Sequence, residues 1–289
     1  MKLLIIGSSG QLGSDFYIYA KRNGYSVDAL DFPQVDIRIY DDLKKKIHQS
    51  SPDVILNCAA FTAVDACETE IKSAYDLNKT GPENIARCAQ YVGATLVHFS
   101  TDYVFSGNKE RPYVEEDQPD PLTVYGKSKL AGEIAVRRTW DKSIVVRIAW
   151  LYGSNGTNFV KSIRSKAKEM SLRGDEMKVV SDQVGTPTWT LDVVKQVILL
   201  LSKKECGVFH CTSQGMCTWY DFACQIIEAA SLPVRLRPCE TSEFPRPARR
   251  PQFSVLENKR LKSLDIDIMP EWTQSFKKYV EYEKSGICV

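Results

Sequence analysis

The sequence has no apolar run near the ~20 residues that a bilayer-spanning helix needs. Its opening, MKLLII, has only four consecutive apolar residues before Gly7, too few for the core of a signal peptide, so we expect a cytoplasmic protein. An excess of charge is also lacking, because 38 Lys and Arg face 36 Asp and Glu, a net charge of +2. This balance gives no electrostatic reason to expect nucleic acid or a membrane surface as a partner.

Metal-binding groups are scarce. The 289 residues include only three histidines, and none of the nine cysteines belongs to a CxxC pair. Cys206, Cys211, Cys217 and Cys224 are separated by four, five and six residues, which is not the spacing of a zinc site. We therefore expect no metal site and reduced, mostly buried thiols.

What the sequence does have is an alternation of short apolar runs with longer segments of helical period. Hydrophobic residues make up 43% and charged residues 26%, as in soluble globular proteins. We expect strands at Lys2–Ile6, Tyr25–Leu30, Val54–Leu56, Thr95–Phe99 and Ile144–Ile148, and helices at Gln11–Arg22, Asp41–His48, Glu68–Tyr91 and Val124–Trp140. This order predicts right-handed βαβ crossovers, so residues 1–150 should form a Rossmann-type, doubly wound parallel α/β domain.

The pattern is looser after Trp150. Pro233–Pro251 holds five prolines and five arginines in nineteen residues, which predicts an ordered surface loop or edge structure. We expect a short strand at Gly207–Cys211 and helices at Asn158–Leu172, Thr190–Leu201, Trp219–Ala230, Leu256–Leu264 and Glu271–Glu283. Residues 151–289 should therefore form a smaller C-terminal α/β domain, with some elements crossing back to the first.

Gly7, Gly10 and Gly13 form a GxxGxxG motif between the first expected strand and helix. Glycines there let backbone N–H groups approach a pyrophosphate at the helix N-terminus, although strand–helix turns also use glycine for steric reasons alone. Asp31 follows Gly13 by eighteen residues, at the end of the second strand, where an acid can bind the adenosine ribose. A carboxylate there repels a 2′-phosphate, so we expect NADH to serve at least as well as NADPH, unless Asp31 is an ordinary surface residue.

Tyr125 and Lys129 are four residues apart on an expected helix, hence on one face. A Lys ammonium stabilises a phenolate, so Tyr125 could exchange protons near neutral pH, although YxxxK also occurs by chance. The tripeptide Ser100-Thr101-Asp102 follows the strand Thr95–Phe99, at the sheet edge where ligands of parallel sheets bind. Together these features predict hydride transfer involving a nicotinamide, with Thr101 polarising the substrate oxygen.

Many segments along the chain carry a more specific signal. They are GSSGQLG (7–13), DI (36–37), NCAAFTAVDACE (57–68), FSTDYVFSG (99–107), YGKSKLAGE (125–133), RIAWLYG (147–153), NFVKS (158–162), VVSDQVGTPT (179–188), WYDFA (219–223) and PARRP (247–251). By their order and spacing the chain resembles the extended short-chain dehydrogenase/reductases, and within them the dTDP-4-dehydrorhamnose reductases.

The resemblance implies roles for particular residues. Thr101, Tyr125 and Lys129 match the catalytic triad. The residues implied to bind NADPH or NADH are Gly7, Gly10, Gln11, Leu12, Gly13, Asp31, Asp36, Ile37, Ala60, Phe61, Thr62, Phe99, Tyr125 and Lys129. Those implied on the nucleotide-sugar side are Thr101, Asp102, Tyr103, Trp150, Asp182, Gln183, Thr186, Pro187, Arg249 and Arg250. Trp150 would lie against a deoxysugar ring, unless it is a packed interdomain aromatic, and the arginines would bind the pyrophosphate, unless they are simply solvated.

The implied reaction is reduction of the C4 keto group of dTDP-4-dehydro-L-rhamnose to dTDP-L-rhamnose. Tyr125 would supply the proton, Thr101 a hydrogen bond, and Lys129 a charge that keeps the pKa of Tyr125 low. A 4,6-dehydratase is disfavoured because those enzymes carry Glu where this chain has Tyr103.

Other interpretations of the resemblance remain open. They are another nucleotide-sugar 4-ketoreductase, an epimerase, and a non-catalytic regulator resembling the β subunit of methionine adenosyltransferase. The resemblance further implies a homodimer, and it raises Mg²⁺ dependence, for which the sequence offers no carboxylate cluster.

Overall fold

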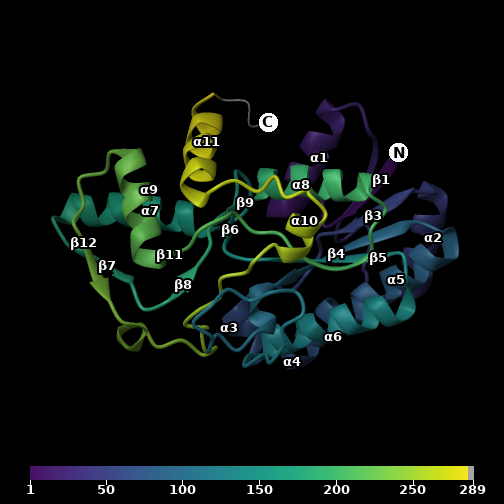
Figure 1. Cartoon of the computed structure of the whole chain (residues 1–289), viewed down its shortest axis with the longest axis horizontal. Helices are drawn as coiled ribbons and strands as arrows, with labels where there is room; N and C mark the ends of the chain where they lie inside the picture. The colour runs from purple at the N-terminus through teal and green to yellow at the C-terminus, as the bar shows by residue number, and fades with distance from the viewer. Residues whose placement is uncertain (286–289) are drawn as a thin grey trace.

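Six parallel strands form the central sheet, in the order β10-β5-β4-β3-β1-β2. The computed structural model describes residues 1–285 and shows this sheet in the larger of two lobes (Figure 1). The strands are β1 (Lys2–Ile6), β2 (Ser26–Leu30), β3 (Val54–Asn57), β4 (Thr95–Thr101), β5 (Ser143–Ile148) and β10 (Gly207–His210). The predicted doubly wound parallel fold is confirmed.

Both faces of the sheet are covered, because successive strand residues point to opposite sides. Leu3 and Ile5 pack toward one core, and Leu4 and Ile6 toward the other. Figure 1 shows α1 and α8 above the sheet and α5 and α6 below it. The covering helices are α1 (Gln11–Arg22), α2 (Tyr40–Ser50), α5 (Gly81–Val92), α6 (Val124–Thr139) and α8 (Thr190–Ser202).

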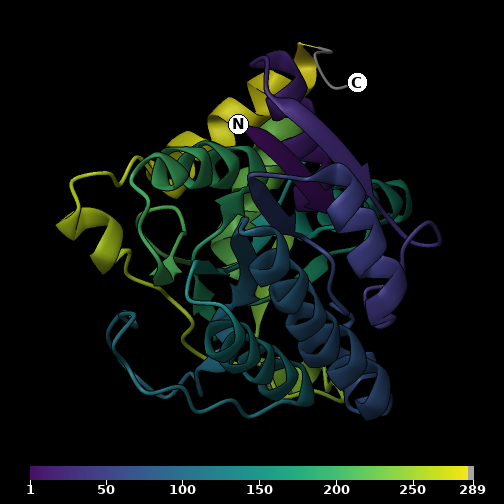
Figure 2. The same ribbon diagram turned by 90° about the vertical axis from the view of Figure 1, so that its right-hand side faces the viewer.

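Two of these elements, α8 and β10, come from the second half of the chain. Helix α8 packs beside α1, and β10 pairs with β5, so that Val193, Leu200 and Phe209 complete the core that Leu3 and Ile5 begin. Figure 2 shows the green and yellow later segments lying against the purple N-terminal strand and helix. The six-stranded sheet and its core are therefore built from both halves of the sequence.

The smaller lobe is centred on a parallel pair of strands at the left of Figure 1. Its aromatic core includes Tyr152, Phe222, Phe276 and Tyr279. Its elements are β6 (Leu151–Tyr152), α7 (Phe159–Arg173), β7 (Met177–Val180), β8 (Val184–Gly185), β9 (Thr188–Trp189), β11 (Cys217–Thr218), α9 (Trp219–Ala230), β12 (Leu236–Cys239) and α11 (Trp272–Lys284). Strand β7, which the sequence analysis did not predict, pairs with β12, so the proline-rich segment is in part an edge strand.

The single helix predicted at Glu68–Tyr91 is wrong. Helices α3 (Val64–Cys67) and α4 (Ile71–Tyr75) precede a π-helical turn at Asp76–Thr80, and only then does α5 begin. The wider turn carries Asn78, whose side chain donates to the Phe61 carbonyl at 3.0 Å and accepts from its N–H at 2.8 Å. These two hydrogen bonds fix the loop after β3, and they explain why a regular α-helix gives way there.

The helix predicted at Leu256–Leu264 is also shorter, since α10 covers only Lys259–Ser263. The preceding residues are extended because their backbone pairs with other segments. The N–H of Tyr113 donates to Val255 at 2.9 Å, and the N–H of Ser254 donates to Val184 at 2.8 Å. Residues 253–257, which we call the strap, therefore cross from the small lobe to the large one.

All eight cysteines among residues 1–285 are free thiols, and five of them are buried. Cys288 lies outside the described residues. Across the same 285 positions, no helix has both the length and the apolar character needed to cross a membrane.

Candidate active site

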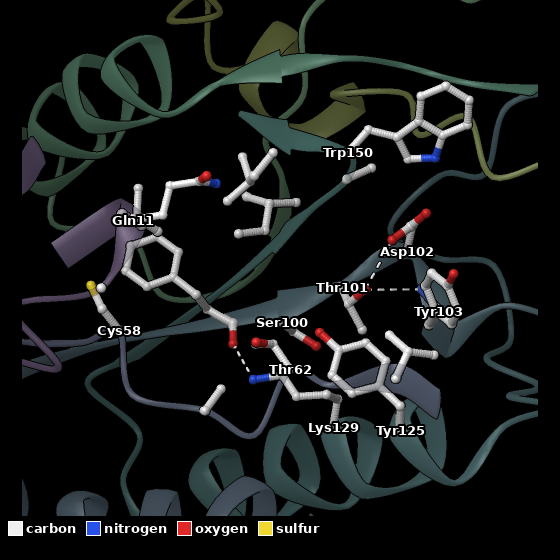
Figure 3. A pocket seen from close by; sticks show the side chains of 18 of the residues that line it. Gln11, Cys58, Thr62, Ser100, Thr101, Asp102, Tyr103, Tyr125, Lys129 and Trp150 are labelled. Atoms are coloured by element: carbon white, nitrogen blue, oxygen red, sulfur yellow. Dashed lines mark hydrogen bonds between the residues drawn. The ribbon is translucent and has the colours of Figure 1, made fainter. Parts of the chain in front are cut away.

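A cavity of about 500 Å³ lies where the carboxyl ends of β1, β3, β4 and β5 meet the small lobe. This is the edge at which open parallel sheets bind ligands. Figure 3 places Gln11 and Cys58 at one end of the cavity and Trp150 at the other, with Thr101, Tyr125 and Lys129 between them. The remaining lining residues are Gly10, Leu12, Asn57, Ala59, Ala60, Thr62, Val64, Phe99, Ser100, Asp102, Tyr103, Ile148, Ala149, Leu151, Thr157, Gln183, Trp219 and Pro251.

The glycine turn leaves the N-terminus of α1 open toward this cavity. Gly7 has a φ of +81°, and a Cβ on Gly13 would lie 2.1 Å from the Gly7 carbonyl oxygen, so neither position admits a side chain without a backbone shift. Gly10 is the N-cap residue, and no side chain caps the helix. The first N–H groups of a twelve-residue helix are thus available to an anion, as a dinucleotide pyrophosphate requires. The residues at this end fit a bound nicotinamide dinucleotide.

A second cavity, of about 290 Å³, lies beside the glycine turn and is lined by Gly7, Asp31, Asp36, Ile37 and other residues. The carboxylate of Asp31 accepts from the N–H of Ser9 at 2.6 Å and from that of Phe32 at 2.9 Å, which fixes it at the cavity rim.

The same cavity is also lined by Arg38, which forms an ion pair with Asp36 at 2.6 Å. The carboxylate of Asp31 and the guanidinium of Arg38 therefore line the same cavity.

Tyr125 and Lys129 lie on the buried face of α6, one turn apart, as their spacing predicted. The Lys129 ammonium donates to the carbonyl oxygen of Phe99 at 2.6 Å. Thr101 is the last residue of β4, and its hydroxyl donates to Asp102 at 2.9 Å. Figure 3 shows the Tyr125 hydroxyl turned toward the end of β4. The structure therefore brings together the three residues that the sequence grouped.

Burial dominates the proton affinities of these groups. It raises the pKa of Tyr125, and a hydrogen bond with Thr101 opposes that rise. Burial lowers the pKa of Lys129 to about 8, against the opposite influence of Glu133 and Cys58. The net shift of the Tyr125 pKa is therefore upward, opposite to the lowering that the sequence analysis expected from Lys129. A protonated phenol is the form that can donate a proton, so Tyr125 is prepared to act as an acid.

An aromatic wall closes the small-lobe end of the cavity. Trp150, with a φ of +47°, stacks on Trp219 with ring centroids 3.3 Å apart and planes 4° apart. Gly185 lies beneath the Trp150 ring, where a Cβ would come within 2.2 Å of an indole carbon. Gln183 accepts from the Trp219 indole N–H at 3.2 Å, which fixes the second ring. Trp219 was not singled out from the sequence, although it opens the WYDFA segment that carried part of the resemblance.

Several residues predicted on the substrate side do not line the cavity. Asp182 accepts from the backbone and hydroxyl of Thr241, and Arg249 is exposed. Arg250 is held by the carboxylate of Asp65 through two contacts of 2.9 Å. Asp182, Arg249 and Arg250 therefore do not line this cavity, and their place on the nucleotide-sugar side stays a prediction.

Other predicted residues lie just behind the walls. Thr186 donates to the carbonyl of Gly215 at 2.8 Å, and Pro187 is buried beside it. Phe61 is half-buried and packs near Tyr125. Within residues 1–285, no three His, Cys, Asp or Glu side chains gather closely enough to hold a metal ion.

The chain matches, over residues 1–285, the family model described as RmlD substrate binding domain. It is 38% identical to the spore coat polysaccharide biosynthesis protein SpsK of Bacillus subtilis, over 99% of each chain. The crystal structure of a dTDP-4-dehydrorhamnose reductase from Clostridium acetobutylicum matches with a TM-score of 0.94 and 43% identity, over 98% of this chain and 100% of that one. A dTDP-4-dehydrorhamnose reductase from Bacillus anthracis, in complex with NADP, matches with a TM-score of 0.92 and 34% identity, over 96% and 98%.

Proposed function

Since the chain belongs to the RmlD substrate binding domain family, we propose that it reduces dTDP-4-dehydro-L-rhamnose to dTDP-L-rhamnose with NADPH or NADH. The observation that carries the proposal is the convergence of Thr101, Tyr125 and Lys129 in the cavity that the glycine turn and Trp150 close from opposite ends. This places the chain among oxidoreductases of nucleotide-sugar metabolism, where the product serves cell-surface polysaccharides.

The proposed mechanism assigns the proton transfer to the protein. A bound nicotinamide supplies the hydride for C4 of the sugar. Tyr125 donates its phenolic proton to the C4 oxygen as negative charge develops there. Thr101 donates a hydrogen bond to the same oxygen, for which its hydroxyl turns from Asp102. Lys129 holds the cofactor ribose and stabilises the phenolate that Tyr125 becomes.

We further propose a division of labour between the lobes. The large lobe binds the cofactor, through the glycine turn, Asp31 and the loop after β3. Residues 1–150 contribute most of this cofactor site. Residues 151–289 contribute most of the nucleotide-sugar side. Trp150, at the end of the first segment, and Trp219, in the second, stack to give a flat apolar surface for a deoxysugar. Tyr103, in place of a carboxylate, supports reduction over dehydration, because elimination of water needs an additional acid–base pair.

The decisive experiment adds purified dTDP-4-dehydro-L-rhamnose to the enzyme with NADPH or NADH and follows absorbance at 340 nm. We expect steady oxidation of the cofactor and, by mass spectrometry, a product two mass units heavier than the substrate. Cofactor binding without turnover would support the regulatory alternative, and turnover with only a different 4-keto sugar would identify another ketoreductase.

Replacing Thr101 with Val should lower kcat roughly a hundredfold and change KM much less. The substitution keeps the side-chain shape but removes the hydrogen bond, which is strongest toward the developing oxyanion. Steady-state kinetics with the 4-keto sugar measure both constants. Equal effects on substrate binding and turnover would make Thr101 a positioning residue, and unchanged kinetics would remove it from the mechanism.

Replacing Asp31 with Ala should shift the ratio of kcat/KM for NADPH over NADH upward, by on the order of tenfold. The substitution removes a negative charge from the cavity where a 2′-phosphate would lie and leaves Arg38 in place. In the wild type, we expect kcat/KM for NADH to equal or exceed that for NADPH. A strong wild-type preference for NADPH, unchanged in the variant, would show that Asp31 does not face the ribose.

We also propose a cytoplasmic homodimer. The free thiols support a reducing compartment. The exposed apolar side chains Tyr91 on α5 and Ile134 on α6 support a covered surface on these helices. The near-neutral net charge supports a small-molecule substrate rather than nucleic acid.

A further inference from the structure

A buried row of polar side chains crosses three neighbouring strands directly beneath α6. Ser100 of β4 is in register with Arg147 of β5, and Arg147 is in register with His210 of β10. Glu133 of α6 meets this row. The Ser100 hydroxyl donates to one Glu133 oxygen, and the Arg147 guanidinium donates to both, at 3.0 Å from Nε and 2.7 Å from Nη2.

Glu133 continues the face of α6 that carries the proposed catalytic residues. It follows Lys129 by four residues and Tyr125 by eight, and the three are only 2%, 3% and 9% exposed. Ser100, which Glu133 holds, lies between Phe99, the acceptor of the Lys129 ammonium, and Thr101. One carboxylate thus contacts the short segment of β4 on which both Lys129 and Thr101 depend.

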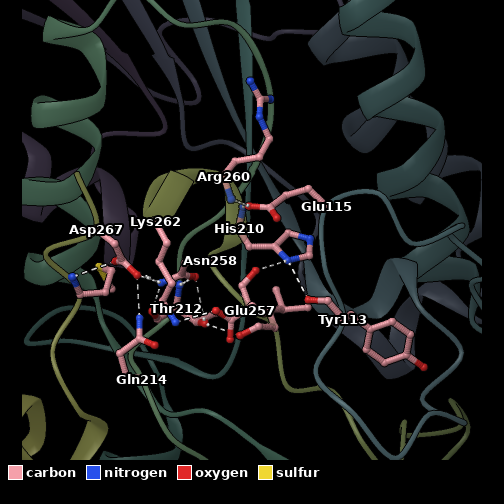
Figure 4. Close-up of polar contacts among 12 residues, drawn as sticks. Tyr113, Glu115, His210, Thr212, Gln214, Glu257, Asn258, Arg260, Lys262 and Asp267 are labelled. Atoms are coloured by element: carbon pink, nitrogen blue, oxygen red, sulfur yellow. Dashed lines mark hydrogen bonds and ion pairs between the residues drawn. The ribbon is translucent and has the colours of Figure 1, made fainter. Parts of the chain in front are cut away.

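His210 completes the network from the other side of Arg147. Its Nδ1 lies 3.1 Å from the carbonyl oxygens of Tyr113 and Glu257, so this nitrogen carries the proton, and Nε2 is left to accept from Arg147 at 3.5 Å. Figure 4 shows His210 with both carbonyl partners. Glu257 belongs to the strap, and Tyr113 lies in the loop before α6 with which the strap pairs. Burial and the Arg147 charge lower the pKa of His210 to about 3, so the imidazole is neutral at ordinary pH.

We propose that Glu133 is a positioning residue for the reductase reaction, which fixes the end of β4 through Ser100 and holds Lys129 in its ammonium form through its negative charge. This inference rests on the proposed function, because it assigns Glu133 a role in the chemistry of Lys129. Arg147, which His210 contacts from its other side, keeps the carboxylate correctly oriented.

The charges around Lys129 support this role. Glu133 lies on the same helix, Cys58 follows β3, His98 lies on β4, and the Tyr125 phenol is one turn away. Burial raises the pKa of Cys58 and lowers that of His98 well below its ordinary value, so both are neutral near pH 7. Among the groups that act on Lys129, Glu133 therefore supplies the negative charge that opposes deprotonation.

The test substitutes Glu133 with Gln, which keeps the size of the side chain and removes its charge. Titration of Lys129 is followed by NMR of protein with ¹³C-labelled lysine, the resonance being assigned with Lys129→Met. We expect Lys129 to lose its proton at a pH lower by on the order of one unit than in the wild type. The alkaline limb of the kcat profile should move in the same direction, and kcat at pH 8 should fall roughly tenfold to a hundredfold.

Two further variants separate positioning from folding. Asp192 is also a buried carboxylate that accepts from a serine hydroxyl, at 2.5 Å from Ser275, but its charged neighbours are Lys195 and Lys278. Asp192→Asn should lower the melting temperature and leave the Lys129 titration unchanged. The double variant Glu133→Gln with Arg147→Met removes the buried ion pair as a whole, so it should recover the stability that the single variant loses. It should nevertheless retain the lowered Lys129 titration.

A wild-type titration of Lys129 in both the single and the double variant would overturn the proposal and leave Glu133 as a structural partner of Arg147. The NMR titration needs no substrate. It therefore decides this inference even if the wild-type protein fails to reduce the dTDP-linked sugar, a result that would count against the proposed function alone.

Discussion

Tyr125→Phe should lower kcat by about 10²–10⁴ while leaving the fold and cofactor binding intact, because general acid catalysis typically contributes that factor. Only the hydroxyl is removed. The ring still packs edge-on against Tyr103, with centroids 5.5 Å apart, and stays within the small cluster that includes Cys67 and Ala74. Single-turnover and steady-state rates with the 4-keto sugar measure the loss.

The pH dependence of the wild type should follow Lys129 on its alkaline side. The pKa of Tyr125 is raised, so its proton is retained through the neutral range, whereas Lys129 loses its proton as the pH rises through about 8. Activity should therefore decline above pH 8 because the ammonium is lost.

For Tyr125→Phe the matched control is Tyr91→Phe, at an exposed position on α5, which should leave kcat unchanged. A Tyr125→Phe enzyme with near-wild-type kcat would exclude Tyr125 as the proton donor.

Gly13→Ala should abolish useful cofactor binding, raising the Kd for NADPH by roughly a hundredfold. The new methyl group would lie 2.1 Å from the carbonyl oxygen of Gly7 and 3.0 Å from the Cα of Ser8, so the turn must open. Overpacking of this kind costs about 1–3 kcal/mol, and a loss of about 3 kcal/mol in binding corresponds to that factor in Kd. Fluorescence titration with NADPH measures the affinity, and thermal unfolding measures the stability.

Gly24→Ala is the matched control, because it lies just beyond the other end of α1. Its φ of +73° makes alanine unfavourable by about 1–2 kcal/mol, but nothing lies within 4 Å of the added carbon. We expect Gly24→Ala to lower the melting temperature without changing the Kd for NADPH. If Gly13→Ala bound NADPH as tightly as the wild type, the glycine turn would not be the pyrophosphate site.

The sequence alone was sufficient to predict helix bounds and side-chain groupings where local pattern and tertiary packing agree. Gln11–Arg22 and Trp219–Ala230 were predicted with their observed bounds, because glycine or a Thr218–Asp221 capping box marks where each helix begins. Tyr125 and Lys129 were grouped correctly because helical spacing alone puts them on one face. These features depend on neighbours within a few residues.

The errors arise where distant segments decide. The π-helical turn at Asp76–Thr80 exists because Asn78 bonds the Phe61 backbone, a contact across seventeen residues. No local pattern indicated that Arg250 would contact Asp65, 185 positions earlier in the chain. Single-sequence patterns contain no record of such partners.

The return of the chain to its first sheet has a consequence for how the protein is made. Strand β5 ends at Ile148, but its neighbour β10 begins only at Gly207, and the same core also needs Leu261, Ile266 and Met269. At about 5–20 residues per second, a ribosome takes roughly 3–12 s to reach β10 after β5. During that interval β5 is an open edge, which is the kind of strand that pairs with other chains. A premature stop before residue 269 should therefore yield an aggregation-prone fragment for the cell's proteases, not a smaller nucleotide-binding protein.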